Sequence, residues 1–112
     1  MIIAKITMHI LPEKRLEVIQ TFLSMIEPTG KETGCLGYSV SYDIEDNNHF
    51  TLLEEWETRE NLDHHIMSRR FDVLLGIKTL LCEPPEVQIY TVSYLEGMEV
   101  VNAVRRKRTQ QL

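Results

Sequence analysis

The chain has 112 residues, which is the length of one ordinary domain and too short for two. Hydrophobic residues make up 43% and charged residues 26% of the sequence, which is typical of globular proteins and excludes the disordered and fibrous classes. The net charge of −5, from 12 basic and 17 acidic side chains, repels polyanions, so we expect no nucleic acid and no membrane as a main partner.

The cysteines and the two ends of the chain give expectations about the cellular compartment and about charged partners. Cys35 and Cys82 lack CxxC spacing and stand beside leucines, so we expect buried thiols rather than a disulfide or metal framework. No basic region followed by an apolar run and a cleavage site is present near the N-terminus, and we expect a cytoplasmic protein. The basic run Arg105–Arg108 could bind phosphate groups, but a solvated tail is the simpler interpretation.

The first two expected elements, a strand and a helix, differ in the spacing of their apolar residues. Apolar residues occupy alternate positions from residue 2 to residue 10, which predicts a strand that buries one face. Pro12 suits the first turn of a helix, because that turn needs no N–H from it. Apolar residues then repeat at helical spacing to about Glu27, or a few residues beyond Pro28. The expected buried stripe consists of Leu16, Ile19, Leu23 and Ile26, with Phe22 beside them.

A hairpin is expected next. Residues 35–43 and 50–57 both alternate, and the segment between them is rich in Asp and Asn, which tolerate turn geometry. In the first of these strands we expect Leu36, Tyr38, Val40 and Tyr42 to share one face. In the second, Phe50, Leu52, Glu54 and Trp56 share one face.

The remaining elements are a helix, a strand and a short C-terminal helix. Thr58 is a suitable N-cap for a helix that runs toward Leu81, which Gly76 could bend or divide. The prolines after Glu83 end this region, and residues 87–94 have the β-branched and aromatic composition of a strand. Beyond Gly97 the spacing of Met98, Val101 and Val104 predicts a short amphipathic helix.

This order, β-α-β-β-α-β, is that of the α+β, ferredoxin-like fold, with one antiparallel sheet and two helices on one of its faces. We assign residues 1–96 to this domain and residues 97–112 to a C-terminal extension with a short helix and a basic tail. Ile3, Leu11 and Leu53 are expected on the other face. A second copy packed sheet against sheet would cover that face, so we expect a homodimer.

Three features could carry chemistry. His64 and His65 are adjacent on a helix and point about 100° apart, so they do not suit one metal ion. Glu54 is expected in an apolar layer beside Trp56, where it needs a partner such as Arg69, Arg70 or a tyrosine hydroxyl, or contact with a pocket. His65 shares the inward helix face with Leu62, where it could accept a proton or could be a core histidine bonded to the backbone.

These residues also occur in a recognisable order. They are E-x-W at Glu54 to Trp56, the histidine at His65, S-x-x-F at Ser68 to Phe71, and T-G-C-L at Thr33 to Leu36. Together these motifs resemble the antibiotic biosynthesis monooxygenase domain family, and most closely its quinol monooxygenase-like members. The resemblance spans residues 1 to 95 and implies a subunit that forms a dimeric α+β barrel, with a pocket between sheet and helices.

The resemblance also implies a reaction. Members oxidise quinols, anthrones or related polyphenols with O₂, and usually need no metal or flavin, so we expect no cofactor. Carried over by motif, His65 is the candidate base and Glu54 would orient His65 or a substrate hydroxyl. Trp56 with Phe71 and Phe22 would form a flat wall for the aromatic substrate.

Further residues and other functions stay open. Tyr38, Tyr42 and Tyr90 could add hydroxyl donors to a cavity, although strand tyrosines more often only pack. The haem-degrading branch of the family has an Asn on its first strand, whereas the first Asn of this chain is Asn47, so haem degradation is disfavoured. A non-catalytic ligand-binding dimer of the same fold, or an isomerase acting on a small metabolite, remain the alternatives to the cofactor-independent monooxygenase.

Overall fold

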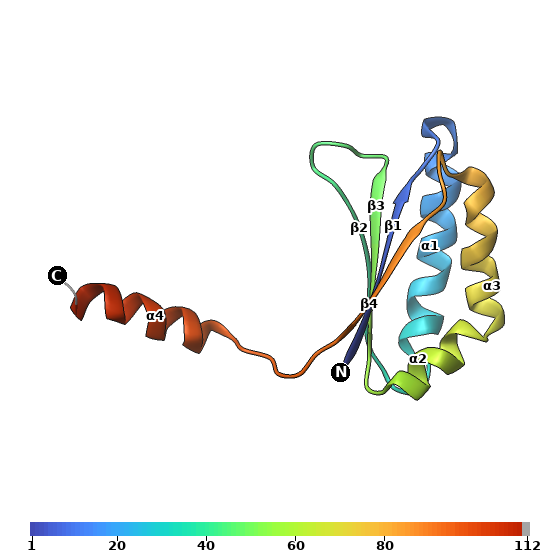
Figure 1. The fold of residues 1–112 in the computed structure, drawn as a ribbon. Helices are drawn as coiled ribbons and strands as arrows, with labels where there is room; N and C mark the ends of the chain where they lie inside the picture. The colour runs from blue at the N-terminus through green and yellow to red at the C-terminus, as the bar shows by residue number, and fades with distance from the viewer. Residues whose placement is uncertain (111–112) are drawn as a thin grey trace.

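The computed structural model describes the backbone of residues 1–110 and the side chains of residues 1–108. It contains one four-stranded sheet, with the helices α1, α2 and α3 together on one face (Figure 1). The strands are β1 (Ile2–His9), β2 (Cys35–Tyr42), β3 (His49–Trp56) and β4 (Glu86–Thr91). The helices are α1 (Arg15–Gly30), α2 (Arg59–Ile66), α3 (Arg69–Gly76) and α4 (Met98–Gln110), with short 3-10 turns at Pro12–Lys14 and Ile77–Leu80. Among these described elements, no helix is both long enough and apolar enough to cross a membrane.

The strand order β2-β3-β1-β4, with every neighbouring pair antiparallel, confirms the ferredoxin-like prediction. The central pair places Ala4 opposite Glu54 and Ile2 opposite Trp56. The alternating apolar residues of β1 and of β3 therefore share the face covered by helices. As predicted, these buried residues are Ile2, Ala4, Ile6 and Met8, followed by Ile10 just after β1, together with Phe50, Leu52, Glu54 and Trp56.

The buried stripe of α1 differs from the prediction. The helix buries Val18, Phe22, Met25 and Thr29. Leu16 and Leu23, which were expected inside, are 68% and 65% exposed. Both sets are spaced at three or four residues, so the sequence pattern fits either one, and only the seating of the helix on β2 selects between them. Helix α1 also continues through Pro28 to Gly30, because a proline near the end of a helix interrupts few backbone hydrogen bonds.

The second helical region divides earlier than expected. The Thr58 hydroxyl accepts a hydrogen bond from the Asn61 N–H, so the predicted N-cap is confirmed. The break comes at residues 67–68, where the Ser68 hydroxyl accepts from the Phe71 N–H and starts α3 as a new helix. Gly76 is the last residue of α3 and does not produce the main break. Ser68 is itself an N-cap residue type, and it was the signal for this break.

Two residues were assigned to the wrong environment. A register shift between Cys35 and Gly37 places Cys35 opposite Trp56 and leaves Leu36 as an extra residue, so Leu36 is exposed and does not continue the Tyr38 face. Cys82 was expected to be buried but is exposed, because a bridge between Ile10 and Leu81 turns the leucine inward and the cysteine outward. Cys35 is half-buried.

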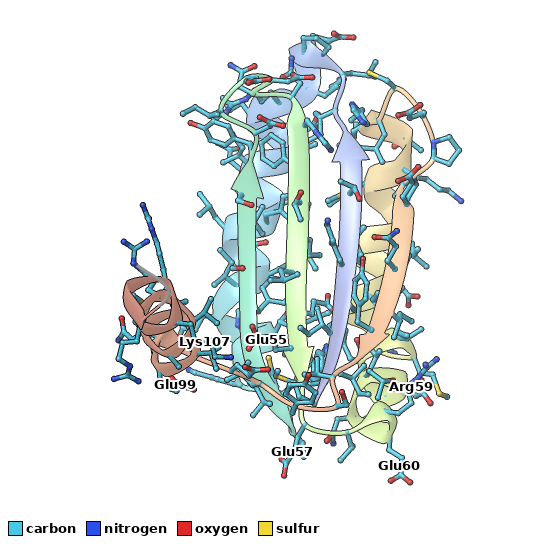
Figure 2. All side chains as sticks on the ribbon, turned by 60° about the vertical axis from the view of Figure 1, so that its left-hand side comes forward. Glu55, Glu57, Arg59, Glu60, Glu99 and Lys107 are labelled. Carbon is cyan, nitrogen blue, oxygen red and sulfur yellow. The ribbon has the colours of Figure 1, made fainter. Side chains whose placement is uncertain are left out.

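The face of the sheet opposite to the helices is more polar than expected. Figure 2 shows this open face toward the viewer, with Glu55 on it and the helices α1 and α3 behind the sheet. Its apolar side chains are Ile3, Leu53 and Tyr90. Leu11 lies beyond the end of β1, and the β4 residues Val87 and Ile89 pair with Ile6 and Ala4 and therefore belong to the helix side. The remaining positions are mostly polar: Lys5, Thr7, Ser39, Ser41, Thr51, Glu55, Glu86 and Gln88.

The C-terminal segment extends away from the rest of the chain. Strand β4 ends at Thr91, three residues before the predicted end at Tyr94. Helix α4 is formed as predicted, and it projects on the open-face side of the sheet (Figure 1). The radius of gyration of 17.4 Å exceeds the value of about 13 Å that is typical of a compact chain of this length. This projecting segment is the reason for the difference.

The choice between the two stripes of α1 can be tested by stability. Phe22→Ala is expected to lower the free energy of unfolding by about 3–5 kcal/mol, because Phe22 is only 2% exposed and stacks on Phe50. Leu16→Ala, on the same helix, should change it by less than about 0.5 kcal/mol. Denaturant unfolding followed by circular dichroism measures both. Equal losses in the two variants would contradict the observed seating of α1.

Candidate functional site

The candidate site lies where β3 ends and α2 begins. Glu54 and Trp56 are on β3, and His65 is in the last turn of α2. Glu32 follows the C-terminal end of α1. Below them, the smaller of two apolar clusters contains Ile2, Ala4, Trp56 and Leu62. The structure therefore brings the three predicted catalytic residues together, and adds a carboxylate from a distant part of the sequence.

Glu54 is a fully buried carboxylate. The indole N–H of Trp56 donates a hydrogen bond to Glu54 Oε1 over 3.1 Å. The other carboxylate oxygen, Oε2, lies 3.3 Å from His65 Nε2. The partners of Glu54 are thus Trp56 and His65, rather than the arginines or tyrosine considered from the sequence. Burial of a carboxylate is costly unless it is paired in this way.

His65 lies between two carboxylates. Its Nδ1 is 2.8 Å from Glu32 Oε2, and its Nε2 faces Glu54. The imidazole is 1% exposed, and its centroid lies 4.7 Å from that of Trp56 at an interplanar angle of 31°. The contact with Glu54 is long for a hydrogen bond, and among the described residues neither Nε2 nor Glu54 Oε2 has a well-formed one. This second contact is therefore chiefly electrostatic.

The two carboxylates favour the protonated form of His65. Burial alone would lower its pKa, but the interactions with Glu54 and then with Glu32 outweigh burial and raise the pKa above the ordinary value. Both ring nitrogens can then carry a proton, each directed at a carboxylate oxygen. The site is thus a carboxylate–imidazolium–carboxylate arrangement held against an indole ring.

Glu32 was not predicted from the sequence as a residue of the site. Its side chain is 17% exposed, so of the two carboxylates it is the one that solvent reaches. Arg70 Nη1 lies 3.5 Å from Glu32 Oε2, which adds a second positive charge to the carboxylate. Glu32 is 33 residues before His65 in the chain and lies outside any helix or strand. Its only signal was its position directly before the motif Thr33 to Leu36.

A tight turn places Glu32 at the site. Gly34 has a φ of 79°, which non-glycine residues rarely adopt, and a Cβ there would collide with the Asn61 side chain. Its carbonyl accepts a hydrogen bond of 2.8 Å from the Glu57 N–H. The glycine of the T-G-C-L motif therefore lets the segment after α1 lie directly against the start of α2.

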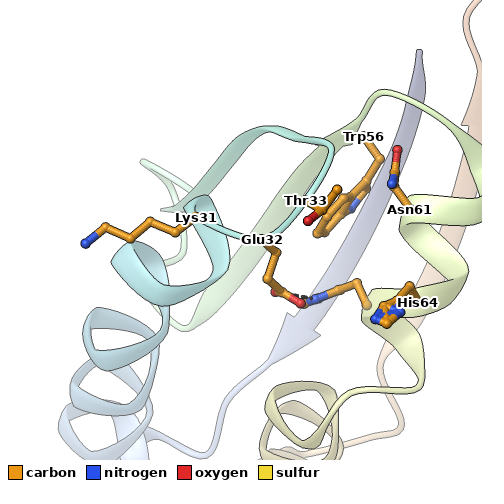
Figure 3. A pocket seen from close by; sticks show the side chains of 7 residues that line it. Lys31, Glu32, Thr33, Trp56, Asn61 and His64 are labelled. Atoms are coloured by element: carbon orange, nitrogen blue, oxygen red, sulfur yellow. Dashed lines mark hydrogen bonds and ion pairs between the residues drawn. The ribbon is translucent and has the colours of Figure 1, made fainter.

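A cavity of about 520 Å³ opens at this site. Figure 3 shows Glu32 directed toward α2, which carries Asn61 and His64, while Lys31 extends outward. His64, which was expected to point elsewhere, also lines the cavity and is exposed. Pockets of a few hundred Å³ or more hold small aromatic molecules. The lining residues are Lys31, Glu32, Thr33, Trp56, Asn61, His64 and His65.

The residues predicted to bind substrate do not line this cavity. Phe71 meets the His65 ring edge-on, with 5.6 Å between centroids, but is absent from the cavity wall. Tyr38 pairs with Glu54 across β2 and β3. Burial, with the nearby charges of Glu54 and Glu32, raises the pKa of Tyr38 well above its ordinary value and keeps its hydroxyl protonated. Phe22 lies under a different groove, between α1 and β2.

Within the described part of the chain, no group of three or more His, Cys, Asp or Glu side chains is arranged to hold a metal ion. His65 is buried and His64 is exposed, although both line the cavity. The structure gives the site acid–base groups and an aromatic wall.

Comparison with known proteins identifies relatives. A family model described as antibiotic biosynthesis monooxygenase matches residues 1–73. An uncharacterized protein of Synechocystis, sll1783, is 34% identical over 83 residues, which is 73% of this chain. The match spans 56% of that relative, so this chain corresponds to little more than half of it.

Solved structures share the fold. A Methanosarcina mazei conserved protein is 34% identical with a TM-score of 0.76, and the match covers 80% of this chain and 89% of that one. A Deinococcus radiodurans protein, provisionally assigned as an antibiotic biosynthesis monooxygenase, has a TM-score of 0.80 at 22% identity, covering 87% and 97% of the two chains. At that identity the second likeness concerns the fold alone.

The charge on His65 can be tested by the pH dependence of stability. Because its folded pKa is raised above the ordinary 6.5, its stabilising effect is complete below that pH and is lost as the pH rises through the folded pKa. The expected loss is about 1.4 kcal/mol for each pH unit between the unfolded and folded pKa. Denaturant unfolding at a series of pH values, from below 6.5 to above the folded pKa, measures the loss, and the His65 ring signals in NMR give the pKa.

Glu32→Gln should lower the pKa of His65 and reduce the loss of stability with pH, because one of the two carboxylates becomes neutral. Glu57→Gln is the matched control, because Glu57 is exposed and does not line the cavity. The substitution therefore removes the same charge away from the site. A wild-type His65 that titrates at or below 6.5 would show that the carboxylates do not hold the proton.

Proposed function

Because this chain belongs to the antibiotic biosynthesis monooxygenase family, we propose that it is a cofactor-independent monooxygenase that oxidises a quinol, an anthrone or a related polyphenol with O₂. The observation that carries this proposal is the Glu32–His65–Glu54 arrangement against Trp56, at the wall of a cavity large enough for an aromatic ring. Such a site combines a proton acceptor, a fixed positive charge and a flat apolar surface.

The proposed reaction needs no other electron donor. A quinol and O₂ give a hydroxyquinone and water, so that one oxygen atom forms a bond to a ring carbon and the other leaves as water. An anthrone likewise gives an anthraquinone and water. In both cases the substrate supplies all the electrons that reduce O₂, and it loses two hydrogen atoms to the water formed. The protein has to create the substrate anion and keep it in place.

Glu32 is the proposed proton acceptor. It is the carboxylate that reaches the cavity, whereas both nitrogens of His65 are directed at carboxylates. A substrate hydroxyl hydrogen-bonded to Glu32 would transfer its proton there, and the imidazolium of His65 would stabilise the negative charge on the substrate. His65, first considered as the base, thus acts as a fixed positive charge, and Glu54 holds it from behind.

Trp56, which is fully buried beneath the cavity, would form its apolar floor. Its indole is held by the hydrogen bond to Glu54 and by the contact with His65, so its orientation is fixed before substrate binds. An aromatic anion next to this floor would lie close to the buried imidazolium of His65, whose positive charge acts more strongly there than it would in water. The anion gives up an electron to O₂ more readily than the neutral phenol.

We also propose that the protein works as a homodimer whose subunits pair through their open sheet faces. The support is the half-buried apolar group of Ile3 and Leu53. These residues lie on the two central strands, on the face of the sheet opposite to α1, α2 and α3. Figure 2 shows this face. The polar residues around this group would form the hydrogen-bonded rim that is typical of such interfaces.

One observation favours a second function. Both nitrogens of His65 already have charged partners, which is also what a histidine with a purely structural role would show. In that case the chain is a ligand-binding dimer, with the cavity as its binding site. The two functions differ in whether O₂ is consumed when an aromatic ligand binds.

Oxygen consumption with a panel of hydroquinones and anthrones tests the proposal. Glu32→Gln and His65→Asn should each lower the rate by about 10²–10⁴-fold, because each removes a group that creates or stabilises the substrate anion. Glu57→Gln should keep the wild-type rate, since Glu57 lies outside the cavity. An oxygen electrode gives the rates, and calorimetry gives the binding of the same compounds.

Two results would contradict the proposal in different ways. Binding of an aromatic compound by the wild type, with oxygen uptake no faster than in buffer, would support the ligand-binding function. Uptake by Glu32→Gln or His65→Asn at the wild-type rate would keep the reaction but remove these residues from it.

A further inference from the structure

Asn61 lines the cavity but has no role in the reaction proposed above. It lies in the first turn of α2, between two fixed neighbours. The hydroxyl of Thr58, the N-cap residue, accepts a hydrogen bond of 3.1 Å from the Asn61 backbone N–H and donates one of 2.7 Å to the side-chain oxygen Oδ1. On its other side the Asn61 side chain packs on Gly34, where an added Cβ would collide with it. Asn61 is therefore held in one orientation.

The fixed amide leaves two hydrogen-bond donors at the cavity wall. Because Oδ1 already accepts from Thr58, Nδ2 is the end of the Asn61 amide that can bind a ligand. Within the described part of the chain, the bond from Thr58 is the one hydrogen bond of this side-chain amide, so both N–H groups of Nδ2 remain for a ligand. An amide that its own fold orients in this way is suited to bind an acceptor oxygen.

Glu32 and Asn61 lie on different sides of the cavity. Figure 3 shows Asn61 on the α2 side of Trp56 and Glu32 on the α1 side. The contacts of Glu32 with His65 Nδ1, at 2.8 Å, and with Arg70 Nη1, at 3.5 Å, both go to its Oε2. The other oxygen, Oε1, is therefore left to accept a hydrogen bond from a substrate. One side of the cavity thus accepts a hydrogen bond, and the other side donates one.

We propose that Asn61 binds the substrate oxygen para to the hydroxyl that Glu32 deprotonates, and that it thereby selects 1,4-hydroquinones. One hydroxyl of such a ring would donate to Glu32, and the oxygen at the opposite end would accept from Asn61 Nδ2. In a catechol the two oxygens are neighbours on the ring, so one ring cannot serve both residues. This inference deepens the proposed function and rests on it for the reaction.

The hydrogen bond from Asn61 would become stronger during the reaction. When the hydroquinone anion gives up electrons to O₂, the oxygen opposite to the deprotonated one changes from a hydroxyl to a carbonyl, and its hydrogen leaves in the water formed. A carbonyl oxygen can only accept, and Nδ2 can only donate. An interaction that improves along the reaction raises kcat more than it lowers KM. The rate should therefore depend on Asn61 more strongly than substrate binding does.

The walls of the cavity also favour a single ring. Above the floor formed by Trp56, the lining residues are polar or charged: Lys31, Glu32, Thr33, Asn61, His64 and His65. Three fused rings need apolar side walls as well as an apolar floor. Anthrone would place its outer rings against hydroxyl, amine and imidazole groups, which lose water without gaining partners. The inferred substrate is therefore a 1,4-hydroquinone with one ring.

Anaerobic binding tests the role of Asn61 apart from the reaction. Calorimetry compares 1,4-hydroquinone with phenol, which lacks the second oxygen. Asn61→Leu keeps the branched shape beside Gly34 and the backbone N–H that Thr58 caps, but it removes the donors. This variant should bind 1,4-hydroquinone about tenfold more weakly than the wild type does, and phenol within about twofold. Catechol binding should likewise not respond to the substitution.

Oxygen uptake tests the effect on the rate. Asn61→Asp keeps the size of the side chain and the acceptor for the Thr58 hydroxyl, and a carboxylate in the first turn of a helix is favourable. It replaces the donors by a negative charge, so kcat with 1,4-hydroquinone should fall about 10²–10³-fold while the midpoint of denaturant unfolding does not fall. Asn47→Asp makes the same change in the exposed turn after β2, outside the cavity, and should keep the wild-type rate.

The outcomes separate this inference from the proposed function. Absence of 1,4-hydroquinone binding by the wild type, or equal binding by the wild type and Asn61→Leu, would overturn the role of Asn61 whether or not oxygen is consumed. Faster oxidation of catechol or anthrone than of 1,4-hydroquinone would overturn the substrate class but keep the monooxygenase reaction. Binding of 1,4-hydroquinone that depends on Asn61, without oxygen uptake, would support the inferred ligand and overturn the reaction.

Discussion

The interaction on which the site depends is the ion pair of His65 with two carboxylates. Its imidazole is almost fully buried, and it joins the segment after α1, strand β3 and helix α2 through Glu32 and Glu54. A lone charge at this depth would be strongly destabilising, so each member of the group needs the others. The same geometry that satisfies the buried charges also leaves one carboxylate facing the cavity.

The surroundings of this group explain its rigidity. Trp56 donates to Glu54 and lies beside the imidazole, and Gly34 allows the segment that carries Glu32 to approach α2. These contacts fix the positions of charge and ring before any ligand arrives, which is what an electrostatically organised site requires. The larger apolar cluster, at the other end of the sheet, keeps the helices seated and is separate from this chemistry.

Most of the fold was predictable, and the errors have a common origin. The order of the elements, the buried faces of β1 and β3, the N-cap Thr58 and the C-terminal helix follow from local patterns that the structure confirms. The stripe of α1 was wrong because Leu16 and Leu23 fit a helical period as well as Val18 and Phe22 do. Leu36 was misplaced by a bulge, which has no marker in the alternation itself.

The sequence alone determined that Glu54 and Trp56 lie on one face and that His65 turns inward, because strand and helix periods are local properties of the chain. Only the tertiary structure decided what these residues meet. Glu32, which completes the group, is 33 residues from His65, and nothing in the period of either segment links the two. The charge on His65 followed from that contact, because the balance between desolvation and nearby carboxylates exists only when the chain is folded.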